Sequence, residues 1–443
     1  MAIIAQKELF SWKEIENYSD LERLKLVIEN IPDEKLMITL ENYRGKGRNN
    51  FPVRAMWNSI MAGVVYQHIS IKSLIRELNR NPSLAQLCGF NIFAGKKGIP
   101  NSSNYTHFLR NLYRVKKLVK EVFENLVTLL NEELPSLGTN LGVDSKAINS
   151  LAKRKNKNKK QDGRRDIDAN YGKKVYKGVH KDGTPWKTEK SWFGYKLHLI
   201  ADVDYELPLG FYVTKASASD TKNLLPLVKE LKDKHDEIVE KAKTMTADKG
   251  YDAYPIILEL KKIYGIDAVI DIRNCWDKKE QEKLLNPEIA DNITYDYSGN
   301  VYCYCNESET RRKMAFAGYE KKRDTLKFRC PADEYGIICK SKKTCCGKNK
   351  TRSVRIPLST DPRIFLPIAR NSYKFKNMYS KRTAVERINS RLDESFGFEK
   401  HYVRGIKKME ITLSISFIVM LGMAYGRIKQ KKPELMRSLV KVA

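Results

Sequence analysis

Three carboxylates stand out because of where they fall along the chain. Asp144 follows the apolar start of "LGVDSKAI", Asp248 lies in "TADKGYD", and Glu386 lies in "YSKRTAVERINSRLD". The first two stretches read as strands and the third as a helix, on which Tyr379, Arg382 and Glu386 share one face. Three carboxylates can hold two hard divalent cations roughly 3.5–4 Å apart, which stabilise the attacking and leaving oxygens of phosphoryl transfer. The chemistry indicated is therefore metal-dependent phosphoryl transfer.

Each carboxylate also has an ordinary explanation when it is taken alone. An aspartate after a strand often caps a turn, and Glu386, between Arg382 and Arg387, can form an ordinary ion pair on the helix surface. The set gains meaning from the strand order, because side chains that leave the ends of neighbouring strands converge on one crevice. A helix packed across that edge can deliver the third carboxylate.

The elements that must position these acids follow an α/β order. Apolar periodicity predicts a strand over 141–148, an antiparallel hairpin over 194–203 and 207–216, and a helix over 220–235. A strand over 243–248, a helix over 253–265 and a strand over 266–273 follow. The intervening segment 153–190 holds 14 Lys or Arg against 5 Asp or Glu. We expect a long loop there, and the run 153–160 either follows DNA phosphates or is simply solvated.

Residues 1–138 read as mostly helical. Helices are expected over 20–43, with a break at Pro32, then two over 52–90 and one long helix over 103–134. Such helix pairs can place a helix in a DNA groove, although a plain helical bundle has the same periodicity.

The charge balance favours a polyanionic partner. Lys and Arg number 82 against 53 Asp and Glu, a net charge of +29. Nucleic acid is the leading candidate, an anionic membrane surface the second, and a merely solvated surface the ordinary alternative. The N-terminus lacks the pattern of a signal peptide, and the apolar stretch 411–425 is shorter than the roughly 20 residues of a membrane span. We expect a cytoplasmic protein with no membrane contact and reduced cysteines.

The helix motif and both acid motifs carry a resemblance. The chain resembles bacterial insertion-sequence transposases of the DDE class, in the group with the signature Y-x2-R-x3-E-x6-K. Tyr379, Arg382 and Glu386 match that spacing, whereas Asp393 stands where the final Lys is expected. The hairpin "WFGYKLHLIADV" also matches, and the resemblance covers about residues 40–425.

The resemblance implies a fold and a set of roles. The fold would be α/β, an RNase H-like mixed-sheet core with a helical N-terminal domain and a cysteine-containing inserted domain. Asp144, Asp248 and Glu386 would be catalytic and would ligate two Mg²⁺ ions, with Mn²⁺ as a substitute. The candidate DNA contacts are Tyr379, Arg382, Lys146 and Arg391, the last as a replacement for the missing Lys.

Four segments follow from the resemblance and the periodicity. Residues 1–138 are a helical domain for DNA-end binding and dimer contacts, and residues 139–272 are the first part of the catalytic core. The inserted domain covers 273–375, and the second part of the core covers 376–430. The inserted domain holds a cysteine cluster, a possible Zn²⁺ site against the alternative of plain buried thiols: Cys303, Cys305, Cys330, Cys339 and Cys345.

The function expected is that of an insertion-sequence transposase. It would cut DNA at the element's ends and transfer the strand to target DNA, as a homodimer on double-stranded DNA, in a bacterial cytoplasm and associated with the nucleoid. The alternatives are a catalytically inactive DNA-binding relative and an RNase H-type nuclease that cuts without joining.

Overall fold

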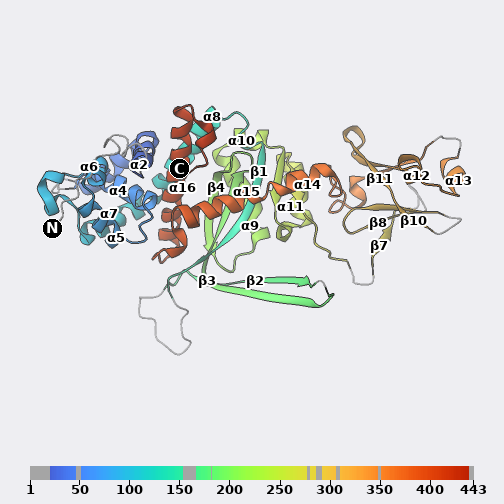
Figure 1. The fold of residues 1–443 in the computed structure, drawn as a ribbon, viewed down its shortest axis with the longest axis horizontal. Helices are drawn as coiled ribbons and strands as arrows, with labels where there is room; N and C mark the ends of the chain where they lie inside the picture. The colour runs from blue at the N-terminus through green and yellow to red at the C-terminus, as the bar shows by residue number, and fades with distance from the viewer. Residues whose placement is uncertain are drawn as a thin grey trace, which may run out of the picture.

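The structure is a computed structural model that describes residues 20–45, 51–152, 166–180, 182–276, 280–285, 292–305, 310–347 and 351–438. The basic run 153–160 lies outside the described residues. Figure 1 shows an elongated molecule, with N-terminal helices at one end, a central sheet, and the inserted segment at the other end.

The N-terminal part is helical, as predicted. Its helices are α2 (Asp20–Asn30), α3 (Glu34–Arg44), α4 (Val53–Val65), α5 (Ile71–Arg80), α6 (Pro82–Cys88), α7 (Ser102–Arg114) and α8 (Lys116–Glu133), with a 3₁₀ segment, η1 (Ile92–Gly98). Two predictions were wrong in detail. The region 52–90 holds three helices because Pro82 starts a new one, and the long helix 103–134 is interrupted at Val115.

A mixed sheet forms the centre. Its strands are β1 (Asn140–Asn149), β2 (Asn170–Val179), β3 (Pro185–Asp202), β4 (Leu207–Lys215), β5 (Thr244–Ala247) and β6 (Asp267–Ile270). The order is β2-β3-β1-β5-β6, and β4 pairs with the free side of β3. β1 runs antiparallel to β3 and parallel to β5, which is parallel to β6. Three antiparallel strands followed by two parallel ones confirm the RNase H-like mixed sheet.

Helices cover both faces of this sheet. On one face, Phe211 of β4 contacts Phe123 of α8 and Phe417 of α16 (Ile406–Lys429), with ring centroids 5.2 and 4.7 Å apart. On the other face, α9 (Asp220–Lys234) accepts a hydrogen bond from the Tyr212 hydroxyl at the Asn223 carbonyl oxygen (2.6 Å). The N-terminal helices and the sheet share one continuous core, so position 138 marks a change of secondary structure within that core.

Residues 153–190 were expected to form a long loop, and over the described residues 166–180 and 182–190 that prediction was wrong. β2 and the first half of β3 pair over ten residues and form a ribbon that projects from the sheet (Figure 1). The Trp192 ring lies over Gly172 and the Trp186 ring over Gly178, where a Cβ would come within 2.6 Å of the indole. Strand pairing satisfies the backbone hydrogen-bonding groups, and the indole rings cover the glycines. The ribbon therefore forms without a hydrophobic core of its own.

The inserted segment has two small sheets and its own core. One sheet has the order β10-β9-β8-β7 and the other β11-β12-β13. The strands are β7 (Glu282–Leu284), β8 (Ile293–Asp296), β9 (Val301–Tyr304), β10 (Arg311–Lys313), β11 (Ala315–Glu320), β12 (Thr325–Arg329) and β13 (Ser353–Pro357), with short helices α12 (Pro331–Glu334) and α13 (Lys342–Cys346). Residues from both sheets, such as Val301 and Phe328, bury together in a cluster separate from the main core.

The chain returns to the central sheet through helices. The single helix expected over 373–398 is divided into α14 (Tyr373–Ser380), α15 (Thr383–Ser390) and a π-helical turn, η5 (Arg391–Ser395). The next helix, α16, is long and apolar enough to cross a membrane, but 83% of its apolar window is buried inside the protein. It packs on α8, α2, α4 and β4, as expected of a core helix.

Candidate active site

Asp144 and Asp248 lie next to each other on neighbouring strands. Val143 of β1 pairs with Ala247 of β5 in parallel register, and an aspartate follows each of them. Paired strands are about 4.8 Å apart, so the two carboxylates leave the sheet side by side. The Asp248 carboxylate also accepts a hydrogen bond from the Lys249 N–H (2.7 Å), which fixes the turn at the strand end.

The surroundings of Asp144 disfavour an unpaired negative charge. Burial raises the pKa of the Asp144 carboxyl to about 6, and the charge of Asp248 acts in the same direction. The Ser145 N–H, which donates to Asp144 Oδ1 (2.7 Å), and the cations of Lys174 and Arg382 offset only part of this effect. Two adjacent carboxylates, of which Asp144 is partly buried, fit a hard divalent cation, which would offset both the burial of Asp144 and the repulsion from Asp248.

Glu386 reaches the same region on α15. This helix crosses β1 at Gly142, where an added Cβ would lie 2.8 Å from Cγ2 of Val385. Glu386 follows Val385, and Asp144 lies two residues beyond Gly142 on the same face of the strand. The missing side chain of Gly142 therefore allows α15 to approach the strand that carries Asp144.

The Glu386 carboxylate is turned towards a neighbour on its own helix. It forms an ion pair with Arg382, and its side chain is 50% exposed. Within the described part of the chain, no three His, Cys, Asp or Glu side chains converge as a ready metal site. The structure thus joins Asp144 to Asp248 and places Glu386 nearby, bound to Arg382.

Tyr379 and Arg382 flank this position. The Tyr379 ring stacks on Phe375 (centroids 5.6 Å apart, planes at 11°), and the Arg382 guanidinium lies 5.8 Å from the Tyr379 centroid. Burial raises the pKa of the Tyr379 hydroxyl, the cation of Arg382 opposes that rise, and the charge of Asp248 adds to it. The helix signature and the second acid therefore share one electrostatic environment.

The other two candidate DNA contacts have different surroundings. Lys146, two residues after Asp144, forms an ion pair with Asp393. Arg391 binds Glu206 through its carboxylate and its carbonyl oxygen (3.1 Å), and only 12% of its side chain is exposed. Lys146 therefore lies beside the carboxylates, whereas Arg391 is committed to a contact within the protein.

Sequence reasoning missed Lys174. Its ammonium, from strand β2, lies 3.4 Å from the Ser145 carbonyl oxygen and lowers the pKa of Asp144 against the larger effect of burial. The segment was read as a loop, and only the register of β2 on β3 brings Lys174 to the site.

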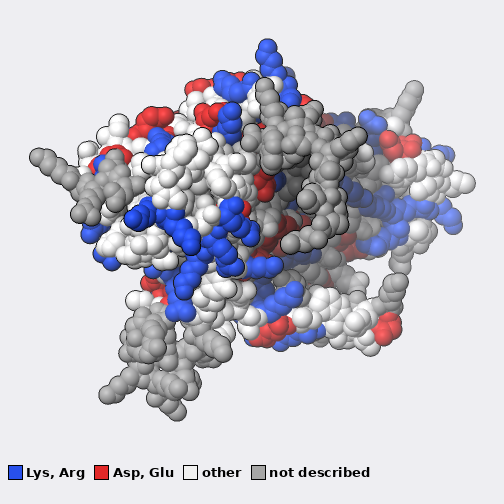
Figure 2. All heavy atoms as spheres, turned by 60° about the vertical axis from the view of Figure 1, so that its left-hand side comes forward, with Lys and Arg blue, Asp and Glu red and all other residues white. Residues whose placement is uncertain are grey.

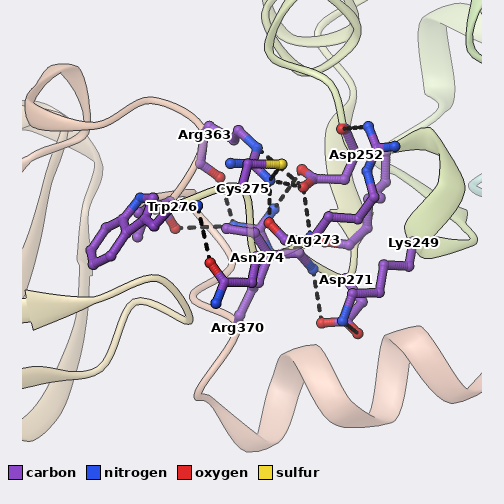
Figure 3. Close-up of polar contacts among 12 residues, drawn as sticks. Lys249, Asp252, Asp271, Arg273, Asn274, Cys275, Trp276, Arg363 and Arg370 are labelled. Atoms are coloured by element: carbon purple, nitrogen blue, oxygen red, sulfur yellow. Dashed lines mark hydrogen bonds and ion pairs between the residues drawn. The ribbon is translucent and has the colours of Figure 1, made fainter. Parts of the chain in front are cut away.

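Sequence reasoning also missed a junction around Asp252, four residues after Asp248 (Figure 3). Its buried carboxylate accepts hydrogen bonds from the Arg273 N–H (2.8 Å) and from Arg363 Nε (3.1 Å), and Arg370 Nη2 lies 3.6 Å away. Arg273 is where the chain leaves for the inserted segment, and Arg370 is where it returns. One carboxylate therefore ties both ends of the insertion to the second acid motif.

The cysteines of the inserted segment gather around one cavity of about 20 Å³. All five that were singled out line it: Cys303, Cys305, Cys330, Cys339 and Cys345. Burial raises the pKa of the Cys303 thiol to about 11, and Cys330, Cys339 and Cys345 contribute in the same direction. Trp276, at the entry to the segment, packs edge-to-face on Tyr295 (centroids 5.8 Å apart), a packing role.

The positive charge is visible on the surface. Figure 2 shows Lys and Arg side chains gathered in a band across the middle of one face, below a largely uncharged region. A basic surface of this kind attracts phosphate backbones.

Comparison with known proteins identifies the family. Residues 164–421 match the model of the transposase DDE domain, and residues 12–111 match a transposase domain of the DUF772 type. The chain belongs to the DDE transposases of insertion sequences, a family that uses divalent metal ions, and it is a DNA transposase. The match begins after Asp144, so it does not include that residue.

Similarity to individual proteins is low. One solved structure, a cryo-EM structure of the piggyBac transposase synaptic complex with hairpin DNA, aligns with a TM-score of 0.38 at 10% identity, over 96% of this chain and 79% of that chain. None of the curated protein sequences matches this chain.

Proposed function

We propose that this transposase cuts DNA at the ends of its element and joins the freed strand to target DNA. The observation that carries the proposal is the pairing of Val143 with Ala247, which sets Asp144 and Asp248 side by side beneath the helix of Glu386. In the first step, water attacks a phosphorus and the P–O3′ bond breaks, leaving a 3′-hydroxyl. In the second, that hydroxyl attacks a target phosphorus and the target's own 3′-oxygen leaves.

Asp144, Asp248 and Glu386 are the residues that would hold two Mg²⁺ ions, or Mn²⁺ in their place. Bound divalent ions supply activation of the attacking oxygen and stabilisation of the leaving oxygen. On this proposal Glu386 gives up Arg382 when it turns towards the aspartates.

The freed Arg382 then binds a phosphate of the DNA backbone, which replaces the carboxylate as its anion. Tyr379 lies beside it and orients the same strand through its hydroxyl. Lys146 supplies a third contact. Arg391 holds Glu206 in place and is left out of the DNA contacts.

The remaining parts of the molecule have supporting roles. We propose that the helical segment 1–138 binds the element's ends and contributes to a homodimer on DNA, with the protein associated with the nucleoid. We also propose a Zn²⁺ site among the five cysteines of the inserted domain, 273–375.

A cleavage and joining assay on DNA with the element's ends tests the proposal. Wild type is compared with Glu386→Gln and with Glu394→Gln, an identical change at an exposed position beyond the same helix. Wild type and Glu394→Gln should cut and join in Mg²⁺, whereas Glu386→Gln should bind the ends and do neither.

Two other results would identify the alternatives. Binding by wild type without cutting in Mg²⁺ or Mn²⁺ would make the protein an inactive DNA-binding relative. Cutting of any duplex without a joined product would make it a nuclease of the RNase H type.

A further inference from the structure

The ion pair between Lys146 and Asp393 joins two residues 247 positions apart in the chain. Lys146 lies on β1 and Asp393 in the π-helical turn η5 that continues α15. Their side chains are 15% and 14% exposed, so the pair is largely withdrawn from water. Single-turn π-helical insertions of this kind occur frequently at functional sites.

The pair lies in line with the catalytic acids. Residues two apart on a strand project from the same face, about 6.6 Å from each other, so Lys146 follows Asp144 along the edge of the site. Above β1, the helix passes from Val385 over Gly142 through Glu386 to Asp393. Strand and helix therefore meet twice, once where Val385 covers Gly142 and once at this ion pair.

The pair is poorly arranged for stability alone. Desolvating two charges is compensated only when the remaining polar atoms are also satisfied. Oδ1 of Asp393 is buried and has no hydrogen-bond partner among the described residues. A buried polar atom without a partner requires an explanation, and a role in binding is one such explanation.

The signature of this helix has a lysine at the position that Asp393 occupies. We propose that the two charges have exchanged places, so that Lys146 on the strand supplies the phosphate-binding cation. Asp393 positions the Lys146 ammonium and is replaced by a backbone phosphate when DNA binds. This inference rests on the proposed function, since the phosphate belongs to the DNA strand that is cut.

The experiment measures binding of end DNA without divalent metal, so that it is independent of cutting. Affinity is followed over a salt series for wild type, Lys146→Met, Asp393→Asn and the double variant Lys146→Met/Asp393→Lys. Each neutralised phosphate contributes about 0.9 to the slope of log K against log salt. Lys146→Met should lose about tenfold or more in affinity and about 0.9 in slope.

The other variants separate a functional role from a structural one. Asp393→Asn should bind at least as tightly as wild type, because the competing anion is removed. The double variant should recover the slope, since it returns the cation to the helix. Thermal unfolding midpoints accompany each measurement. If Lys146→Met does not fold, Lys146→Met/Asp393→Asn, which leaves neither charge unpaired, replaces it and should show the same loss of affinity and slope.

Opposite results would overturn the inference. An unchanged affinity and slope for Lys146→Met, or for Lys146→Met/Asp393→Asn in its place, would show that Lys146 does not contact phosphate. A folded Lys146→Met/Asp393→Lys variant whose salt slope stays below that of wild type would show that a lysine at position 393 cannot take over the phosphate contact of Lys146. If wild type binds but never cuts in Mg²⁺, the proposed function fails while this binding comparison still stands.

Discussion

Gly142 lies directly beneath Val385, so close that a Cβ on the glycine would come within 2.8 Å of Cγ2 of the valine. The same added Cβ would lie 2.6 Å from Cγ1 of Val203. This contact sets the height of the helix that carries Glu386 above the strand that carries Asp144. The approach of α15 to β1, and with it the proposed geometry of the acids, therefore depends on the absence of one methyl group.

Gly142→Ala should displace α15 from β1 and impair catalysis. Overpacking a filled site costs about 1–3 kcal/mol, so the unfolding midpoint should fall, and end cleavage should fall more than DNA binding. The matched control is Gly63→Ala in α4, where the new Cβ meets only Leu74 at 3.6 Å and a helical glycine becomes alanine. Full cleavage activity in Gly142→Ala would show that the close approach does not position Glu386.

Asp252→Asn should destabilise the junction between the core and the inserted segment. Its side chain is fully buried, and Arg370, 4% exposed, would keep a charge without its partner. Breaking a buried pair in this way costs about 3–5 kcal/mol, which urea unfolding can measure. Asp236→Asn is the control, because Asp236 is 57% exposed and its ion pair with Lys232 is long, with 3.8 Å between nitrogen and oxygen. Equal stability of the two variants would contradict a structural role for Asp252.

The positions of the first two acids were predictable from the sequence. Each follows a short apolar run that predicts a strand, and the strand order placed both strands in one sheet. Asp248 directly follows β5 as expected, whereas β1 continues to Asn149, so Asp144 lies within its strand and not at its end. Gly142 gave no comparable signal, since a glycine in a strand is also compatible with a bulge or with a bend.

Contacts between distant and polar segments were not predictable. The ribbon that delivers Lys174 is rich in lysine and glycine, and its stability comes from pairing with β3 and from the rings of Trp186 and Trp192. The orientation of Glu386 towards Arg382 is a rotamer choice. The hydrophobic periodicity of the sequence contains no information about the pairing of the ribbon or about the orientation of Glu386.

His198 should make stability depend on pH. Its ring is buried and its Nε2 lies 2.9 Å from the Thr214 hydroxyl. Burial lowers the pKa of His198 to about 4, Lys196 and Lys174 lower it further, and Asp220 opposes the shift. Because the folded pKa lies below the unfolded value of about 6.5, this contribution is full above pH 6.5 and is lost as pH falls towards 4.

Urea unfolding of wild type and His198→Gln between pH 7.5 and 4 measures this contribution. The free energy of unfolding of wild type should fall faster with acid, by up to about 1.4 kcal/mol per pH unit more than in the variant. His107→Gln, at an exposed position, should follow wild type. Parallel curves for wild type and His198→Gln would show that His198 is not held neutral by the fold.

The cysteine cluster of the inserted segment leads to a prediction about metal content. Five thiols line one cavity of about 20 Å³, large enough for a single ion. As they stand, no three of these side chains converge, so zinc binding requires their rotation and the loss of thiol protons. We expect purified wild type to carry about one zinc per chain by elemental analysis.

Substitutions distinguish a zinc site from plain buried thiols. Cys303→Ser with Cys339→Ser should abolish the zinc and lower the unfolding midpoint, because two ligands of a tetrahedral site are removed. Cys275→Ser is the control, since this exposed cysteine contacts Arg363 and lies outside the cavity. A chelator should destabilise wild type and the control but leave the double variant unchanged. Protein that is free of zinc after expression in zinc-supplemented medium, and indifferent to chelator, would mean that the thiols only fill the core of the inserted segment.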